Sequence, residues 1–334
     1  MKRIAILGAG SWGTALAIVL SKSHQRHAIS LWVRQKALAA KIAASRVNEI
    51  YLPGQKLLDS IKITPDAAVA IEHAEVLVGA VPAAYTRRVF QEVLPKIAKD
   101  AVIVSATKGL EPESHARPSE IISEVLALRM RPRIAVLSGP SFAAEAAAGQ
   151  PTAVVLASVD PALADELQRE FAGPAFRLYT NDDVLGVELA GAMKNVIAIA
   201  AGACQGLGLG ANPVAALITR GLAEMSRLAA ALGARPETLG GLAGLGDLVL
   251  TCTGALSRNR HVGIELGKGR ALPAILAEMK MVAEGVPTAP ALLALARETG
   301  VELPITEQVA AILREGQSPR DAIRAIMERP LKRE

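Results

Sequence analysis

The stretch RIAILGAGSWGTALAIVL, residues Arg3–Leu20, decides the fold of the first part of this 334-residue chain. A short β-rich run is followed at once by a G-x-G-x-x-G loop and then by an apolar, helix-forming segment. Strand, glycine loop and helix in this order predict a dinucleotide-binding loop. Gly8 permits the tight turn, Gly10 lets the backbone approach a pyrophosphate, and Gly13 lets the helix pack closely on the strand.

The same N-terminus resembles a secretory signal peptide, because the basic residues MKR precede an apolar run with small residues. The regular glycine spacing favours the dinucleotide loop over this alternative, because a signal peptide needs no such pattern. The only two cysteines, Cys204 and Cys252, form no C-x-x-C pair, which is typical of a reduced cytosolic protein. We therefore expect a cytoplasmic location.

Further apolar runs alternate with helical segments, a pattern that predicts a parallel sheet covered on both faces. The runs are 28–34, 76–82, 101–109, 133–141, 152–158 and 176–180. Ligands of such sheets bind beyond the carboxyl ends of the strands. Two ends carry Lys108 and the segment GPSFA, 139–143, whose backbone N–H groups suit an anion or a carbonyl.

The second predicted strand ends in Arg34, where NAD-binding proteins usually place an acidic residue against the ribose 2′-hydroxyl. A guanidinium suits a 2′-phosphate instead. We therefore expect NADPH to be preferred or accepted. The alternative is an arginine that faces solvent and has no role.

After about residue 180 the strand pattern stops and helical patterns follow. They cover 184–204, 213–232, 271–281, 289–299, 306–315 and 319–328. The sequence therefore predicts an α/β, Rossmann-type parallel-sheet domain over 1–181 and an all-helical domain over 182–334.

Capping residues support several of these helices. Asn212 and Ser318, each followed by proline, predict N-caps. Gly233 and Gly316 predict helix ends. We expect these four positions to mark the boundaries of their helices.

The predicted helix 184–204 contains Lys194 and Asn195 in the middle of an otherwise apolar stretch. One interpretation is a solvated face of a surface helix. The other is a lysine that is buried because chemistry requires it, with a pKa lowered by its apolar surroundings. The stretch is too short, and too clearly interrupted by Lys194, to predict a membrane span.

The glycine-rich stretch GGLAGLGDLVLTCTGALSRNRHVG follows between two helices. Asp247 and Thr251 are one helical turn apart, so both can face one site. Ser257 before a helical run predicts an N-cap that directs the N–H groups of the next residues, with Arg258 and Asn259, at an anion. The alternative is an ordinary capped surface helix whose arginine lies in solvent.

Composition argues against other classes of function. The net charge is +5 without a long basic run, and aromatic residues make up 3%, which does not favour a nucleic-acid surface. The five histidines form no H-E-x-x-H motif, so we expect no metal site. We also expect no membrane insertion.

Several motifs taken together resemble those of the NAD(P)-dependent glycerol-3-phosphate dehydrogenase family, the bacterial soluble type. They are GAGSWGTALA, TKGL, SGPSFA, GVELAGAMKNVIAIAAG, NPVAALITRGLAEM, GLAGLGDLVLTCTGALSRNR and VAEG. The resemblance implies a Rossmann domain and a helical domain, NADP(H) or NAD(H) as cofactor, and a cytoplasmic homodimer. It also implies reversible reduction of dihydroxyacetone phosphate to sn-glycerol 3-phosphate, which supplies glycerophospholipid synthesis.

The family's functional residues carry over to matching positions. Lys194 matches the proton acceptor. Substrate contacts match Lys108, Gly139, Ser141, Lys194, Asp247, Ser257, Arg258 and Asn259. Cofactor contacts match Ser11, Trp12, Arg34, Lys108, Ala143, Arg258, Val282 and Glu284.

In the chemistry that this resemblance implies, Lys194 protonates the alkoxide that forms at C2 of the substrate. Lys108 adds a second positive charge, and Asp247 orients the Lys194 ammonium. Two alternatives remain open at this point. One is a related two-domain NADP-dependent dehydrogenase of another small hydroxy acid, which has no need of the phosphate-binding SRN motif. The other is a non-catalytic NADP-binding sensor or scaffold, which could dispense with both lysines.

Overall fold

The structure, a computed structural model, describes residues 1–331 and 333. The chain divides into two units, which we call the first and the second unit. The first unit comprises 1–108 and 116–188, and the second comprises 109–115 and 189–334. The division at residues 188 and 189 falls inside α8 (Val184–Gly206), so this helix contributes residues to both units.

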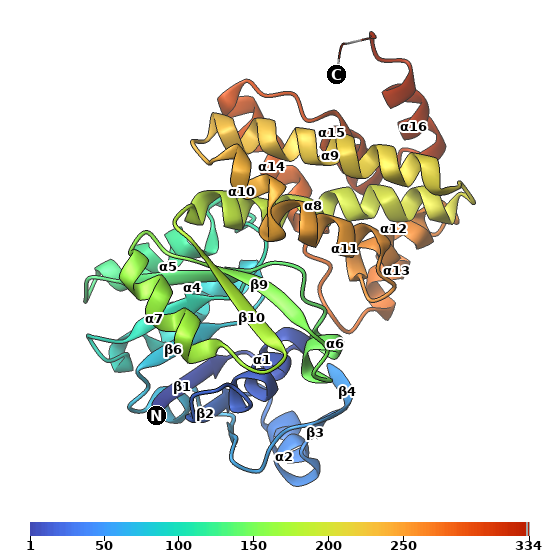
Figure 1. The fold of residues 1–334 in the computed structure, drawn as a ribbon. Helices are drawn as coiled ribbons and strands as arrows, with labels where there is room; N and C mark the ends of the chain where they lie inside the picture. Colours follow the sequence, from blue (N-terminus) through green and yellow to red (C-terminus); the bar gives the residue numbers. More distant parts are fainter. Residues whose placement is uncertain (332, 334) are drawn as a thin grey trace. The chain divides into compact units, whose positions relative to one another are not determined.

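In the described residues the first unit contains an eight-stranded sheet with the order β10-β9-β8-β7-β6-β1-β2-β5 (Figure 1). Its strands are β1 (Lys2–Leu7), β2 (His27–Trp32), β5 (Lys62–Thr64), β6 (Val76–Gly79), β7 (Val102–Ser105), β8 (Arg133–Ser138), β9 (Thr152–Ala157) and β10 (Phe176–Asn181). All the predicted strands are confirmed, but several end earlier than predicted. Arg34 and Lys108 therefore lie in the segments beyond β2 and β7.

The prediction of a parallel sheet is wrong for one pair, because β8 and β9 are antiparallel. Their connection contains only α6 (Ala143–Ala147), whose five residues span roughly 8 Å. A strand of six residues is about 20 Å long. A helix of this length does not run back along the sheet, and β9 begins at the edge where β8 ends. β9 and β10 then pair in parallel across a longer helix.

Helices cover both faces of the sheet because successive strand residues point to opposite faces. Ile4 and Ile6 of β1 pack in the same apolar cluster as α1 residues, whereas Leu7 packs in a second cluster with Phe90 of α4. The helices of this unit are α1 (Ser11–Ser21), α2 (Lys36–Ser45), α3 (Ala67–Ile71), α4 (Thr86–Val93), α5 (Pro118–Ala127), α6 and α7 (Pro161–Phe171). A two-stranded hairpin, β3 (Val47–Asn48) and β4 (Leu52–Lys56), lies outside the main sheet.

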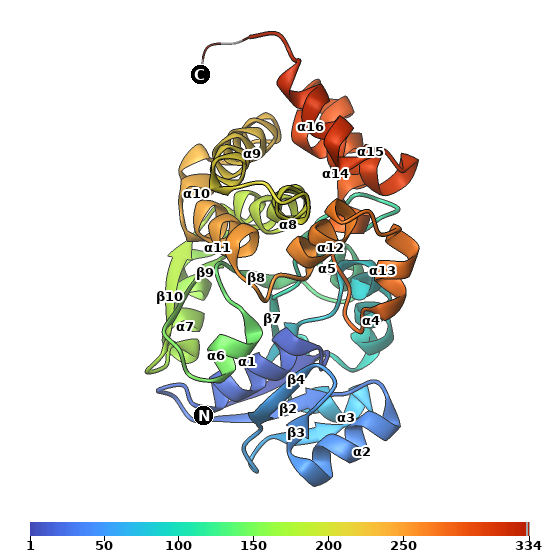
Figure 2. The same cartoon turned by 90° about the vertical axis from the view of Figure 1, so that its right-hand side faces the viewer.

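The regular elements that the structure describes in the second unit are all helices, as predicted (Figure 2). After α8 it contains α9 (Ala211–Ala231), α10 (Pro236–Gly240), a π-helical turn at Leu242–Gly246, α11 (Asp247–Thr253), α12 (Arg258–Gly267), α13 (Leu272–Glu278), α14 (Gly285–Thr299), α15 (Pro304–Glu315) and α16 (Pro319–Met327). In Figure 2, α8 lies in the middle of these helices.

Three of the four predicted helix boundaries are confirmed. Ser318 caps α16 by accepting a hydrogen bond from the Asp321 N–H, and Gly233 and Gly316 follow their helices with positive φ. The prediction that Asn212 is an N-cap is wrong, because α9 begins at Ala211. Proline is tolerated throughout the first helical turn, where N–H groups lack intrahelical acceptors, so the Asn-Pro pair did not fix the exact start.

Among the described residues, α8 is the one helix long and apolar enough to cross a membrane by length and composition alone. Its most apolar window is 83% buried inside the protein. Burial among neighbouring helices explains its composition, since a core helix meets the same criteria as a spanning one.

Glycines bring α8 and α12 into direct backbone contact. A Cβ on Gly202 would lie 2.0 Å from the Arg260 carbonyl oxygen, and one on Gly263 would lie 2.0 Å from that of Ile199. Gly206 and Gly267 continue the same close approach one turn along each helix. We call this set of four glycines the α8–α12 contact. It allows no side chain between the two helices and so fixes how closely they approach.

Candidate active site

The glycine loop after β1 has the geometry that a dinucleotide requires. Gly8 adopts a φ of +114°, which L side chains rarely adopt. A Cβ on Gly13 would lie 1.9 Å from the Gly8 carbonyl oxygen, so only glycine fits there. Gly10 precedes the first residue of α1, and a Cβ on it would meet no atom within 4 Å. The loop is therefore tight on its inner side and open at Gly10.

The first turn of α1 suits a negatively charged ligand. Its residues Ser11 and Trp12 follow Gly10, and the turn carries no acidic residue. The first N–H groups of a helix lack intrahelical acceptors and carry a partial positive charge. Among residues 1–331 and 333, no atom accepts a hydrogen bond from the buried Nε1 of Trp12. These features fit the pyrophosphate of a dinucleotide.

Arg34 lies two residues beyond the end of β2, with its side chain exposed. Its guanidinium carbon is 5.8 Å from the centroid of the Tyr85 ring, a cation–π distance. The segment Val33–Lys36 contains no acidic residue that could bind a ribose 2′-hydroxyl. The end of β2 therefore presents a positive charge that suits a 2′-phosphate.

The structure brings three predicted residues together at the carboxyl ends of neighbouring strands β7 and β8. The Lys108 Nζ donates to the Gly139 carbonyl oxygen at 2.9 Å, and the Ser141 hydroxyl donates to the same oxygen at 2.9 Å. Gly139 has a φ of +127°, which turns the chain sharply after β8. Ala143, the first residue of α6, follows this turn. The lysine is thus held at the edge where ligands of such sheets bind.

In the second unit, Lys194 is buried and paired, not solvated. Its Nζ lies 2.9 Å from the Asp247 Oδ1 and donates to the Thr251 Oγ1 at 2.8 Å. The exposed fractions of Lys194 and Asp247 are 6% and 1%. Thr251 in turn donates to the Asp247 backbone oxygen at 2.6 Å, because the two residues are one turn apart on α11. A buried carboxylate this close favours the positively charged form of the lysine.

An amide network links the helix of Lys194 to α12. The Asn259 Nδ2 donates to the Asn195 Oδ1 at 2.9 Å, and the Asn259 Oδ1 accepts from the Gly285 N–H at 2.9 Å. The Asn195 Nδ2 donates to the Gly191 carbonyl oxygen at 3.2 Å. The Asn259 side chain therefore links α8 to the start of α14.

The start of α12 forms as predicted. Ser257 is its N-cap, and its hydroxyl accepts a hydrogen bond from the Arg260 N–H at 3.2 Å. The exposed Arg258 donates from Nη1 to the Val282 carbonyl oxygen at 3.0 Å. Glu284 immediately precedes α14. The second unit thus joins a capped helix N-terminus and an arginine, a combination that binds phosphate.

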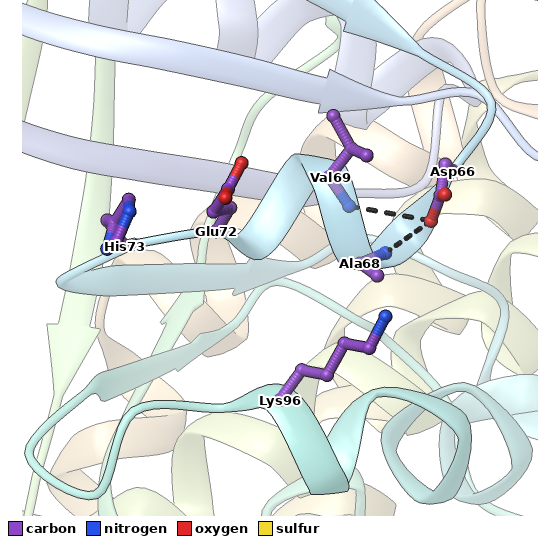
Figure 3. Close-up of a pocket in the computed structure, with 6 residues that line it drawn as sticks. All are labelled: Asp66, Ala68, Val69, Glu72, His73 and Lys96. Carbon is purple, nitrogen blue, oxygen red and sulfur yellow. Dashed lines mark hydrogen bonds between the residues drawn. The ribbon is translucent and has the colours of Figure 1, made fainter.

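A surface hollow in the first unit is lined by none of the residues that the sequence predicts for the site (Figure 3). It is lined by Asp66, Ala68, Val69, Glu72, His73 and Lys96. The Asp66 carboxylate accepts hydrogen bonds from the backbone of Ala68 and Val69, as the cap of α3. The Asp66 carboxylate therefore stabilises the start of α3.

The sequence alone did not indicate two polar residues that lie near these sites. Asn48, in the hairpin, donates hydrogen bonds to Ala9 and Thr14. Tyr85 lies against Arg34. No local motif marks these contacts, because Ala9 and Thr14 lie more than 30 positions from Asn48, and Arg34 lies more than 30 positions from Tyr85.

A dinucleotide loop on a Rossmann sheet and a buried lysine–aspartate pair on helices define a two-domain, nicotinamide-dependent dehydrogenase. Comparison with known proteins gives the family. The model for the NAD-dependent glycerol-3-phosphate dehydrogenase N-terminus matches residues 3–164, and the model for the C-terminus matches 183–324. The chain belongs to the NAD-dependent glycerol-3-phosphate dehydrogenase family.

Individual relatives are similar to this chain over nearly its whole length. A glycerol-3-phosphate dehydrogenase (NAD(P)+) of Koribacter versatilis is 54% identical over 331 residues, which are 99% of this chain and 98% of that protein. One of Acidobacterium capsulatum is 51% identical over 335 residues, covering 99% of both. The crystal structure of a glycerol-3-phosphate dehydrogenase from Coxiella burnetii is 41% identical with a TM-score of 0.93, covering 98% of this chain and 99% of that one.

Proposed function

We propose that this enzyme reversibly reduces dihydroxyacetone phosphate to sn-glycerol 3-phosphate with NAD(P)H, and so supplies glycerol 3-phosphate for glycerophospholipid synthesis. The observation that carries the proposal is the buried Lys194, held 2.9 Å from Asp247 in a chain that also has the dinucleotide loop. A buried ammonium with a fixed carboxylate partner is expensive to maintain, so its retention favours a chemical role.

The bound cofactor supplies the hydride that adds to the substrate carbonyl carbon. The carbonyl oxygen then gains negative charge and needs a proton, which Lys194 donates from Nζ. Asp247 keeps the lysine charged and oriented before the transfer, and the Thr251 hydroxyl fixes the direction of one N–H. In the reverse direction the neutral lysine accepts the proton from the substrate hydroxyl.

Lys108 has a different task in this proposal. Its ammonium stabilises the negative charge that develops on the substrate oxygen, without transferring a proton. The hydrogen bond to the Gly139 carbonyl holds its long side chain in one direction. Ser141 shares that acceptor and keeps the turn after β8 in the same arrangement.

The substrate phosphate is assigned to the start of α12. Ser257 caps the helix, the backbone N–H groups of Arg258 and Asn259 follow, and the Arg258 guanidinium supplies positive charge. We assign to Asn259 a contact with the substrate, and to its side-chain bonds with Asn195 and Gly285 a positioning role. Val282 and Glu284 are assigned to the cofactor on the family resemblance.

We also propose a preference for NADPH, a homodimer and a cytoplasmic location. Arg34, without a neighbouring acidic residue, supports the first. The homodimer and the cytoplasmic location rest on the family resemblance. Light scattering coupled to size-exclusion chromatography measures the oligomeric state directly.

One assay separates the proposed activity from its alternatives. Oxidation of NADPH is followed at 340 nm with dihydroxyacetone phosphate and with unphosphorylated dihydroxyacetone, and NADP+ reduction is followed with small hydroxy acids. We expect turnover with the phosphorylated substrate and a strong loss without the phosphate. Turnover with hydroxy acids alone identifies the related dehydrogenase instead, and binding of NADPH without any turnover identifies a sensor.

A further inference from the structure

Asn48 joins the hairpin of the first unit to the dinucleotide loop. The side chain is fully buried, although it lies on the two-residue strand β3 outside the main sheet. Its Nδ2 donates to the Ala9 carbonyl oxygen and to the Thr14 Oγ1, both at 2.9 Å. Its Oδ1 accepts from the Tyr51 N–H at 3.3 Å. All three bonds are internal, so the amide cannot turn without leaving a buried polar group unpaired.

The bond to Ala9 fixes the direction of a peptide group in the middle of the G-x-G-x-x-G loop. In a planar trans peptide the carbonyl of one residue and the N–H of the next point in opposite directions. Asn48 holds the Ala9 carbonyl toward the buried side of the loop. The Gly10 N–H of the same peptide therefore points away from Asn48, and Gly10 is where the loop is open.

The neighbouring peptide is fixed in a different way. The Gly10 carbonyl accepts from the Thr14 N–H at 3.0 Å as the first bond of α1. The helix therefore holds the peptide after Gly10, whereas the peptide before Gly10 lies outside the helix. A side-chain hydrogen bond, donated by Asn48, holds the Ala9 carbonyl of that earlier peptide.

We propose that Asn48 is a positioning residue for the cofactor: it holds the Ala9 carbonyl inside the protein and so directs the Gly10 N–H at the pyrophosphate of the bound dinucleotide. The inference rests on the proposed use of NAD(P)H and extends it to a residue outside the glycine loop. Asn48 touches no ligand itself and acts through the orientation of one peptide group.

The test is direct binding to the full-length protein, measured by isothermal titration calorimetry. NADPH contains the pyrophosphate, whereas adenosine 2′-monophosphate carries the adenine and the 2′-phosphate without it. Asn48→Asp preserves size but places an oxygen against the Ala9 carbonyl. We expect its Kd for NADPH to rise about tenfold, the equivalent of one well-placed hydrogen bond, with the Kd for adenosine 2′-monophosphate within about twofold of wild type. Asn48→Ala provides the same test if the aspartate variant does not fold.

Thr14→Val is the matched control, because it removes the second acceptor of the same amide and leaves the Ala9 bond in place. The substitutions at Asn48 and at Thr14 should all lower the melting temperature. Only those at Asn48 should raise the Kd for NADPH. An equal rise for both nucleotides, an equal rise in Thr14→Val, or wild-type affinity in folded Asn48 variants overturns the proposal. A wild-type protein that binds no NADPH refutes the proposed function itself, which is a different outcome.

Discussion

Two sets of glycines arrange the site residues, and they do so for different physical reasons. In the loop after β1, Gly8 is needed for its backbone torsion, with a φ of +114°. In the α8–α12 contact, Gly202 and Gly263 have ordinary helical torsions and are needed because the partner backbone lies within 2.0 Å of each Cβ position. The first set shapes a turn, and the second sets a distance between two helices.

Substitutions in the two glycine sets should therefore change different properties of the enzyme. The loop lies at the proposed cofactor site, whereas the α8–α12 contact holds the helix of Lys194 at a set distance from the helix that begins with Arg258. Damage to the loop should weaken cofactor binding. Damage to the contact should alter the chemistry and the affinity for the phosphorylated substrate.

A substitution at Lys194 should have the largest effect. It tests whether the residues near the α8–α12 contact perform chemistry and do not bind the cofactor. Lys194→Met retains an unbranched side chain but removes the proton donor. We expect kcat with dihydroxyacetone phosphate to fall about a thousandfold, as for loss of a general acid. The Kd for NADPH, measured by fluorescence, should stay near the wild-type value.

The control for that variant is Lys41→Met, which removes an exposed lysine from α2. It should leave turnover unchanged. Lys194→Met also leaves Asp247 buried without its cationic partner, so its thermal stability should fall. Near-normal turnover in a folded Lys194→Met protein would refute the assignment of this lysine as the proton donor.

The next effect compares the two glycine sets directly. Gly263→Ala forces a methyl group against the Ile199 carbonyl oxygen and pushes α12 away from α8. We expect a loss of about 1–3 kcal/mol in the free energy of unfolding and a KM for dihydroxyacetone phosphate raised about tenfold. Gly13→Ala should show a similar loss of stability but instead raise the Kd for NADPH.

Gly240→Ala is the control for both variants, because a Cβ at that position meets no atom within 4 Å. Its KM and Kd should match those of wild type. If Gly263→Ala and Gly13→Ala raise the same constant, the two sets do not have the separate roles that their positions indicate.

The same contrast explains how much the sequence could predict. The loop was predictable because its glycines, strand and helix are contiguous, and the cap at Ser257 was predictable because it depends on residues within one turn. The α8–α12 contact was not, because Gly202 and Gly263 lie on helices that are separated in the chain by α9, α10 and α11. For the same reason the role of Asn48 was not predictable, since Ala9 and Thr14, to which it donates, lie in a distant segment.

The antiparallel pairing of β8 and β9 was not predictable from hydrophobic pattern, since apolar strands of either direction look alike once buried on both faces. The connection between them differs from a usual crossover in its helix, because α6 is only five residues long. Burial of Lys194 was left open by its own helix, which is apolar on every side. Its partner Asp247 comes from α11, and only the packing of the two helices brings them together.

A substitution at Arg34, in the first unit, should have a smaller effect. It tests the proposed contact with the 2′-phosphate of the cofactor. Arg34→Ala should raise the Kd for NADPH about tenfold and leave that for NADH unchanged, because only NADPH carries the 2′-phosphate. Arg177→Ala is the matched control: its guanidinium also lies over a tyrosine ring, at 5.1 Å, but on β10. An equal loss of both cofactors in Arg34→Ala would contradict the specificity role.

The two buried thiols of the second unit should have the smallest effect, which is on the pH dependence of stability. Burial raises the pKa of Cys204, and it raises the pKa of Cys252 from 9.0 to about 12. The folded state therefore keeps a proton that the unfolded chain loses above pH 9. Unfolding then becomes more favourable as the pH rises from about 9 toward 12, because the unfolded state binds fewer protons.

Urea unfolding at pH 8 and pH 10 measures this loss, and Cys252→Ala isolates it from other groups that titrate in the same range. We expect the wild type to lose about 1 kcal/mol more than the variant between the two pH values, the linkage expected for one thiol over one pH unit above its unfolded pKa. Equal losses in both proteins would mean that the Cys252 thiol titrates as it does in water, which is incompatible with its position on the buried face of α11 beside Thr251.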